Sequence, residues 1–214
     1  DAVAGLVRYA DALAEWAETK EARAAIELPD LSGDLPSGIV PSMAARDALA
    51  AAGVPLVGAE LAAAVEEALE AAEEFGYPLA MKIESSDLPH KTEAGGVWLG
   101  VKDAADVRAA FDGIVANAKR HAPDAKIDGI VVQEMASGAV ELVVGLKRDP
   151  VFGPVVMAGL GGVFVEVLRD VAFRKCPVTE AEALAMLDEL EGAAMLDGVR
   201  GAAPVDRQAV AELI

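Results

Sequence analysis

Two hydrophobic periodicities alternate along the chain from residue 41 onwards, and each predicts one kind of element. Apolar residues spaced three and four apart indicate amphipathic helices. Such helices are predicted at residues 42–52, 60–75, 103–121, 179–191 and 205–214. Short apolar runs between Gly, Pro and Asp residues indicate buried strands. These runs lie at residues 54–57, 78–83, 96–101, 128–135, 140–147, 154–158, 163–168 and 171–175.

Capping residues support several of the predicted helices. Ser42 can cap the first of them, and Asp103 can cap the helix that ends near residue 121. Thr179 is followed three positions later by Glu182, which is the pattern of a capping box.

The N-terminal 37 residues have a different pattern. Residues 1–25 predict an amphipathic helix, and residues 28–41 are dense in Gly, Pro, Ser and Asp, which is typical of a linker. Two interpretations are open: the tail of an upstream domain, or a first helix of the domain that follows.

Strand order suggests how the rest of the chain is arranged. A Ser137–Gly138 turn predicts a hairpin between residues 128–135 and 140–147, and a second antiparallel pair is expected around Arg169–Asp170. The order is α/β first, then strand-rich, then helical. We therefore expect an α+β fold of two subdomains with a cleft between them.

Composition limits the function classes. The formal net charge of -18 opposes non-specific binding of nucleic acid or anionic lipid. No apolar run reaches the length of a membrane span and no secretory segment opens the chain, so we expect a cytoplasmic protein without a membrane partner. The single cysteine, Cys176, allows neither an internal disulfide nor a cysteine zinc cluster.

Residues 77–100 combine cations and glycines between two apolar runs. Lys82 lies within the first run, where a lysine either reaches a cleft or extends its amine past the strand end. His90 and Lys91 follow in a polar loop that ends at Gly95 and Gly96. Glycines let backbone N–H groups approach phosphate oxygens and lysines supply charge, so this stretch suits a polyphosphate. A solvated loop histidine is the plain alternative for His90.

The motifs of several rival chemistries are missing. There is no GxxxxGK[ST] phosphate loop, no GxSxG elbow and no HExxH zinc motif. The GLGG run at 159–162 lacks the spacing of a dinucleotide fingerprint.

Four segments in order resemble the ATP-grasp domain of the NDP-forming acyl-CoA synthetases, relatives of succinyl-CoA synthetase. The resemblance covers about residues 38–205 and rests on MKIESSDLPHKTEAGGV (81–97), VVQEM (131–135), ELVVGLKRDPVFGPVVMAGLGGVFVEVLRD (141–170) and LDGVRG (196–201). It implies an ATP-grasp fold, ATP or ADP with Mg²⁺, and a phosphohistidine intermediate in the interconversion of acyl-CoA and acid.

The resemblance assigns roles in the cationic stretch. Lys82 corresponds to a lysine that binds nucleotide phosphates, and His90 to a histidine that relays the phosphoryl group. Lys91, Gly95 and Gly96 correspond to the glycine-rich phosphate loop. A neutral imidazole is nucleophilic near pH 7, which suits phosphoryl relay.

It also assigns a base and ribose site. Glu134 and Met135 correspond to the hinge that receives adenine, and Glu141 lies where a ribose contact is expected. Gln133 is a further candidate, because it lies at the same strand end, which could offer backbone groups to adenine. For Mg²⁺, Glu166 is the first choice, and Asp149 and Asp170 are the weaker ones.

The chain departs from the family pattern at its end, where no acidic-Asn-Pro strand occurs before Ile214. We therefore expect an ATP-grasp domain at residues 38–214 that is truncated, with residues 1–37 as the tail of an upstream ligase domain. CoA would be bound by domains absent from this chain, in the same polypeptide or a partner subunit, and the full enzyme is expected to be an oligomer. Two alternatives remain: a regulatory acyl-CoA-sensing domain of a protein lysine acetyltransferase, and a non-catalytic scaffold subunit.

Overall fold

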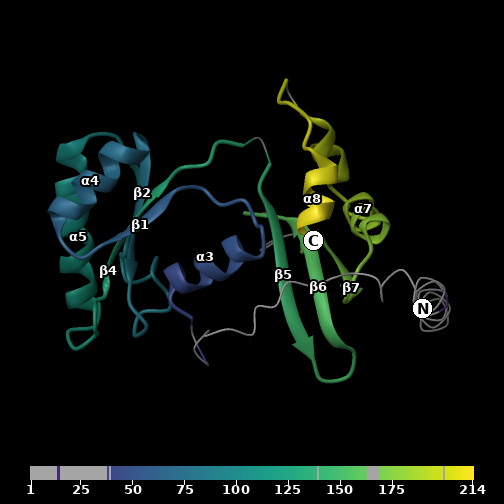
Figure 1. Cartoon of the computed structure of the whole chain (residues 1–214), viewed down its shortest axis with the longest axis horizontal. Helices are drawn as coiled ribbons and strands as arrows, with labels where there is room; N and C mark the ends of the chain where they lie inside the picture. Colours follow the sequence, from purple (N-terminus) through teal and green to yellow (C-terminus); the bar gives the residue numbers. More distant parts are fainter. Residues whose placement is uncertain (1–13, 15–37, 39, 139, 163–168, 200) are drawn as a thin grey trace. The chain divides into compact units, whose positions relative to one another are not determined.

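The structure, a computed structural model, describes Ala14, Gly38 and residues 40–138, 140–162, 169–199 and 201–214. It divides into two compact units, which meet in sequence between Ser137 and Gly138. We call them the four-stranded unit (residues 40–137) and the three-stranded unit (residues 140–214). Each unit combines one antiparallel sheet with helices (Figure 1), so the α+β prediction is confirmed. The helix predicted at residues 1–25 lies, apart from Ala14, outside the described residues.

The four-stranded unit contains three helices and one sheet. Its elements in chain order are α3 (Ser42–Ala51), β1 (Ala59–Ala62), α4 (Val65–Phe75), β2 (Leu79–Glu84), β3 (Val97–Val101), α5 (Ala104–His121) and β4 (Gly129–Glu134). The strand order is β1-β4-β2-β3, and every neighbouring pair is antiparallel.

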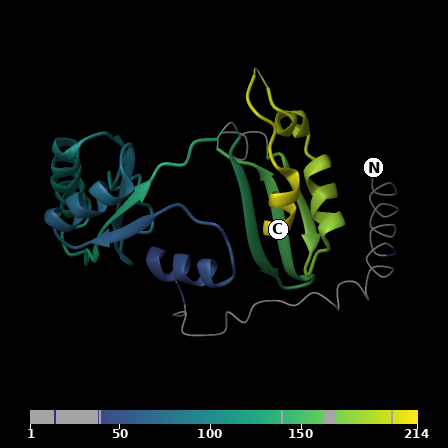
Figure 2. The same cartoon turned by 45° about the horizontal axis from the view of Figure 1, so that its top comes forward.

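One face of this sheet forms the core with α4 and α5 (Figure 2). Because side chains alternate along a strand, Leu79, Met81 and Ile83 of β2 all point to that face, where they are fully buried. Val107 and Ile114 of α5 cover them. The predicted cap of α5 is confirmed, because Asp103 accepts a hydrogen bond from the amide of Asp106.

The predictions near β1 were wrong in two respects. The strand forms at Ala59–Ala62 rather than at 54–57, and α4 begins at Val65 rather than at residue 60. Residues 59–62 pair with β4 residue by residue, and this pairing overrides the helix propensity of the alanines that follow Glu60. The cap of α3 is also different, because Pro41 is its N-cap and Ser42 is its first helical residue.

The three-stranded unit has a smaller core. Its strands are β5 (Leu142–Asp149), β6 (Gly153–Leu160) and β7 (Val171–Lys175), in that order and antiparallel. Its helices are α7 (Glu180–Asp188), the 3-10 turn η1 (Ala193–Asp197) and α8 (Arg207–Leu213). The capping box of Thr179 and Glu182 opens α7 as predicted. The buried residues that form the core are Val156, Ala158, Leu160, Ala172, Met186, Leu187, Leu190 and Leu196.

The predicted hairpin between residues 128–135 and 140–147 was wrong. β4 lies between β1 and β2, and β5 belongs to the other sheet. Both edges of β4 are already hydrogen-bonded, so no edge remains for β5.

The strand expected at 163–168 lies outside the described residues, and β7 pairs with β6. Among the helices that the structure describes, none has both the length and the apolar character to cross a membrane.

Candidate functional site

The face of β2 that points away from the core carries a polar cluster. Alternation along the strand directs Ala80, Lys82 and Glu84 to this face, opposite to Met81 and Ile83. The ammonium of Lys82 donates to Oε1 of Gln133 on β4 at 3.0 Å. Lys82 and Gln133 are diagonal neighbours across the β2–β4 pair, because Lys82 lies opposite Val131 and Ala80 lies opposite Gln133.

Glu84 is a buried carboxylate that accepts hydrogen bonds from a lysine and from a backbone amide. Its Oε2 accepts from Nζ of Lys91 at 2.7 Å, and its Oε1 accepts from the amide of Ser42 at 2.7 Å. Lys91 also donates to Oγ of Ser42 at 2.7 Å. Burial by itself raises the pKa of Glu84, but the hydrogen bonds from Lys91 and Ser42 outweigh burial and leave that pKa below its ordinary value. Glu84 is therefore charged near neutral pH.

Three cations lie close together beside this carboxylate. Burial lowers the pKa of Lys82 below its ordinary value, and the charges of Lys91 and Arg46 lower it further. Arg46, on α3, donates to the carbonyl of Val57. Like charges that are partly desolvated favour the binding of an anion, so this cluster is a candidate phosphate site.

The loop between β2 and β3 is folded tightly against the same strand. The amide of Gly96 donates to the carbonyl of Lys91 at 2.8 Å, and the amide of Ile83 donates to the carbonyl of Gly96 at 2.7 Å. A Cβ at position 96 would lie 2.5 Å from Cγ2 of Ile83, and position 95 has a φ of +64. Only glycine fits both positions, and the loop thereby brings Lys91 to Glu84. His90 lies exposed in this loop.

The hinge candidates lie at the end of β4. The carboxylate of Glu134 accepts from the amide of Gly58, and the amide of Glu134 donates to the carbonyl of Gly58 at 3.0 Å. The side chain of Glu134 thus fixes the segment before β1, while Met135 is exposed. Adenine recognition at residues 133–135 remains a prediction.

Glu141 lies directly before β5 and packs against the glycines at the end of β6. Its carbonyl accepts from the amide of Gly161 at 2.6 Å, and a Cβ on Gly161 would lie 2.8 Å from Cγ of Glu141. Gly161 and Gly162 of the GLGG run therefore allow a close contact with Glu141, a role that the sequence did not indicate.

The metal candidates that the structure describes do not lie together. Asp149 accepts from the amides of Val151 and Phe152, which lowers its pKa, and it lies opposite Gly153 at one end of β6. Asp170 precedes β7 at the other end, roughly 20 Å away along the strand. The two oxygens of Asp170 accept from the amides of Glu191 and Gly192, both at 2.8 Å. Glu166 lies outside the described residues. Within the described ranges, no three His, Cys, Asp or Glu side chains are grouped so as to hold a metal ion.

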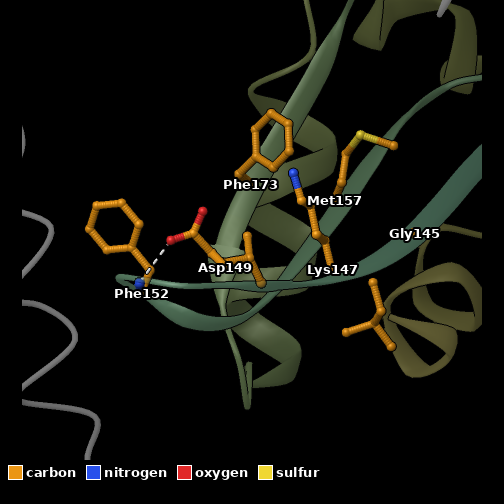
Figure 3. A pocket seen from close by; sticks show the side chains of 8 residues that line it. Gly145, Lys147, Asp149, Phe152, Met157 and Phe173 are labelled. Carbon is orange, nitrogen blue, oxygen red and sulfur yellow. Dashed lines mark hydrogen bonds between the residues drawn. The ribbon is translucent and has the colours of Figure 1, made fainter.

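The three-stranded unit has an apolar groove on the face of its sheet that points away from the core. Its volume is about 550 Å³, and Figure 3 shows Met157, Phe173 and Lys147 along it. Met157 lies opposite both Gly145 and Phe173, so the groove crosses all strands of this sheet. The groove was not predicted from the sequence, although β6 has apolar residues on both of its faces, a pattern that could have indicated a second apolar surface.

Ser42, Arg46 and Glu84 were also missed in the polar cluster. Glu84 could have been noticed, because it follows Lys82 by two positions and must share its face. Ser42 and Arg46 contact partners 42 and 11 residues away, beyond the three- and four-residue spacings of a local pattern.

The chain is similar in sequence and in fold to known proteins. A family model described as "ATP-grasp domain" matches residues 36–214. The beta subunit of acetate–CoA ligase (ADP-forming) I from Pyrococcus furiosus is 42% identical over 170 residues, which are 79% of this chain and 73% of that protein. Acetate–CoA ligase (ADP-forming) I from Archaeoglobus fulgidus is 45% identical over 166 residues, but this chain covers only 24% of it.

Solved structures give the same result. A structure of the dinucleotide-forming acetyl-coenzyme A synthetase 1 of Ca. Korarchaeum cryptofilum, in complex with coenzyme A and Ca-AMPCP, matches with a TM-score of 0.78 and 43% identity. The match covers 81% of this chain and 76% of that chain. A second structure of that enzyme, with coenzyme A and Mg-AMPPCP, is described as having its phosphohistidine segment pointing towards the nucleotide binding site (TM-score 0.67, 39% identity, 79% and 72% covered).

Proposed function

Because this chain belongs to the ATP-grasp family, we propose that it is the nucleotide-binding part of an ADP-forming acyl-CoA ligase. The observation that carries the proposal is the cationic cluster on the open face of β2. In this cluster Lys82 lies near Lys91, and Lys91 belongs to a loop in which positions 95 and 96 accommodate only glycine. The names of the relatives supply the reaction class, since they are ADP-forming acetate–CoA ligases.

In this reaction a carboxylic acid, ATP and CoA are converted reversibly into acyl-CoA, ADP and phosphate. The phosphoryl group passes through a phosphohistidine, as the description of the related structure with Mg-AMPPCP suggests. Lys82 and Lys91 would offset the charge on the nucleotide phosphates, which is the main task of a protein in phosphoryl transfer. His90, exposed beside Lys91, is proposed as the residue that receives and passes on the phosphoryl group.

Mg²⁺ would reduce the negative charge on the nucleotide phosphates. Asp149 and Asp170 do not fit together as its ligands, because they lie at opposite ends of β6 and both accept backbone hydrogen bonds. Glu166 therefore stays the leading proposed ligand of the ion.

The proposed partners are the domains that bind CoA and form the acyl phosphate. This chain covers 24% of the Archaeoglobus relative, so most of that relative lies outside the match, as the proposal of further domains requires. The ligase names of the relatives favour the catalytic interpretation over the regulatory and scaffold alternatives.

Calorimetry with Mg·ADP on the 214-residue chain tests the proposal. We expect saturable binding of one nucleotide per chain, because the cationic cluster lies on a single face of one sheet. Absence of binding in a folded sample would leave the scaffold interpretation in place.

A further inference from the structure

We propose that Glu84 is a positioning residue that links the phosphate loop to helix α3. This inference rests on the proposed function and concerns the same site. Neither the resemblance nor the relatives assign a role to this position.

The carboxylate of Glu84 is the point at which three segments meet. One oxygen binds Lys91 of the loop and the other binds the first amide of α3, each at 2.7 Å. Ser42 completes the triangle, because its hydroxyl accepts from Lys91 at 2.7 Å. The glutamate itself is only 5% exposed and stands on the central strand β2, so it is the fixed member of the three.

Helix α3 depends on these bonds for its position. None of its residues is buried, and its N-cap, Pro41, offers no side-chain hydrogen bond. The amides of a first helical turn have no partner within the helix, and a carboxylate at this end also interacts favourably with the helix dipole. Glu84, which belongs to β2, supplies both the hydrogen-bond acceptor and the negative charge at the start of α3. Arg46, whose guanidinium donates to the carbonyl of Val57, makes a further polar bond of α3.

Lys91 is oriented by the same carboxylate. An ammonium group has three donors, and Glu84 and Ser42 accept two of them. The third is left for an acceptor such as a phosphate oxygen. Glu84 also offsets the mutual repulsion of Lys82, Lys91 and Arg46, which allows the three cations to stay together before an anion binds.

Two effects of removing this charge have opposite signs, and this makes the proposal testable. Deleting a carboxylate beside a phosphate site should by itself strengthen the binding of a polyanion. If Glu84 positions Lys91 instead, its removal should weaken binding, because the lysine loses its fixed direction.

The first experiment measures Mg·ADP and AMP affinities of the 214-residue chain by calorimetry. We expect Glu84→Gln to weaken ADP binding by about tenfold and AMP binding by less than about twofold, since the loss of a charged hydrogen bond concerns the terminal phosphate. Glu60→Gln, the same change at an exposed residue of β1, serves as the control and should change neither affinity. ADP binding by Glu84→Gln that equals or exceeds that of the wild type would overturn the proposal.

A double-mutant cycle shows whether Glu84 acts through Lys91. If it does, Glu84→Gln should have almost no further effect in a Lys91→Met background. A purely structural role predicts instead that the two losses add, and it also predicts equal losses for ADP and AMP.

The second experiment needs no nucleotide. Ser42→Pro removes the amide and the hydroxyl that contact Glu84 and Lys91, while proline is well tolerated at the first position of a helix. Pro41 already has the extended conformation (φ -55, ψ 143) that a following proline requires. We expect the amides of residues 46–52 to exchange hydrogen at least about tenfold faster in Ser42→Pro and in Glu84→Gln.

Unchanged protection of α3 in both variants would overturn the link to the helix. Wild-type protein that protects α3 but binds no Mg·ADP would contradict the proposed function alone, so the two failures are distinguishable.

Discussion

The two sheets of this protein are built alike, but their open faces have opposite chemistry. In each unit, helices form the apolar core against one face of an antiparallel sheet, and on the other face of the four-stranded sheet the first residue of α3 contacts Glu84. On the four-stranded sheet that face carries Lys82, Glu84 and Gln133, joined by hydrogen bonds within the unit. On the three-stranded sheet it carries Met157 and Phe173 along an apolar groove.

The difference shows what alternation does at each sheet. In β2 two of the positions that alternate with the core residues, Lys82 and Glu84, are charged and partly desolvated, so we expect this face to select ligands by charge. In β6 the corresponding positions, Val155 and Met157, are apolar, and apart from Lys147 and Asp149 the side chains that line the groove are apolar, so we expect shape and apolar area to dominate its selection of ligands. The following predictions test this contrast, in order of decreasing expected effect.

The largest effect should come from the loop of the polar face. We expect His90→Ala, introduced into the complete enzyme, to lower turnover by at least about a thousandfold, because the variant loses the imidazole that is proposed to receive the phosphoryl group as a phosphoramidate. The affinity for ADP should stay near that of the wild type. Turnover at the wild-type rate would reduce His90 to an exposed loop residue.

The next largest effect should be on stability, where substitutions on the two faces of the three-stranded sheet should differ. Leu160 is fully buried, so Leu160→Ala should lower the free energy of unfolding by roughly 3 kcal/mol. Phe173 is 56% exposed on the open face, so Phe173→Ala should cost less than about 1 kcal/mol. Urea denaturation of both variants measures the contrast. Equal losses would mean that the groove is covered in solution.

Removal of the positive charge of Lys82 should weaken nucleotide binding without unfolding the protein. We expect Lys82→Ala to lower the affinity for Mg·ADP by at least about tenfold, since it removes a charge-assisted contact to phosphate. Lys102→Ala removes an exposed lysine after β3 and is the matched control. Calorimetry on both, with circular dichroism to verify the fold, gives the answer. A folded Lys82→Ala variant with unchanged affinity would remove Lys82 from the site.

The smallest effect is a pH dependence of stability. The pKa of Lys82 in the folded protein lies below its ordinary value of 10.5, so between these two values the unfolded chain binds more protons. Stability should therefore rise with pH in this alkaline window for the wild type, relative to Lys82→Met. Denaturation of both proteins at several pH values measures the difference. A difference that falls with rising pH would contradict the lowered pKa.

Prediction from sequence succeeded where local pattern decides and failed where pairing decides. The capping box at Thr179 and the cap at Asp103 were predicted correctly, since both involve residues three positions apart. The α+β fold and the family were also predicted correctly. The hairpin between the segments that became β4 and β5 was wrong, because sequence does not reveal that β1 and β2 occupy both edges of β4.

The sequence by itself determined which side chains share a face. Alternation in residues 79–84 separates Lys82 and Glu84 from the core residues of β2, because the period of a strand is local. Only the tertiary structure decided which groups these side chains meet. The partners of Glu84 are 42 residues upstream and 7 residues downstream, and Asp170 binds amides 21 and 22 residues away. Such contacts depend on the tertiary fold, because a buried carboxylate accepts hydrogen bonds from whichever donors the fold brings close to it.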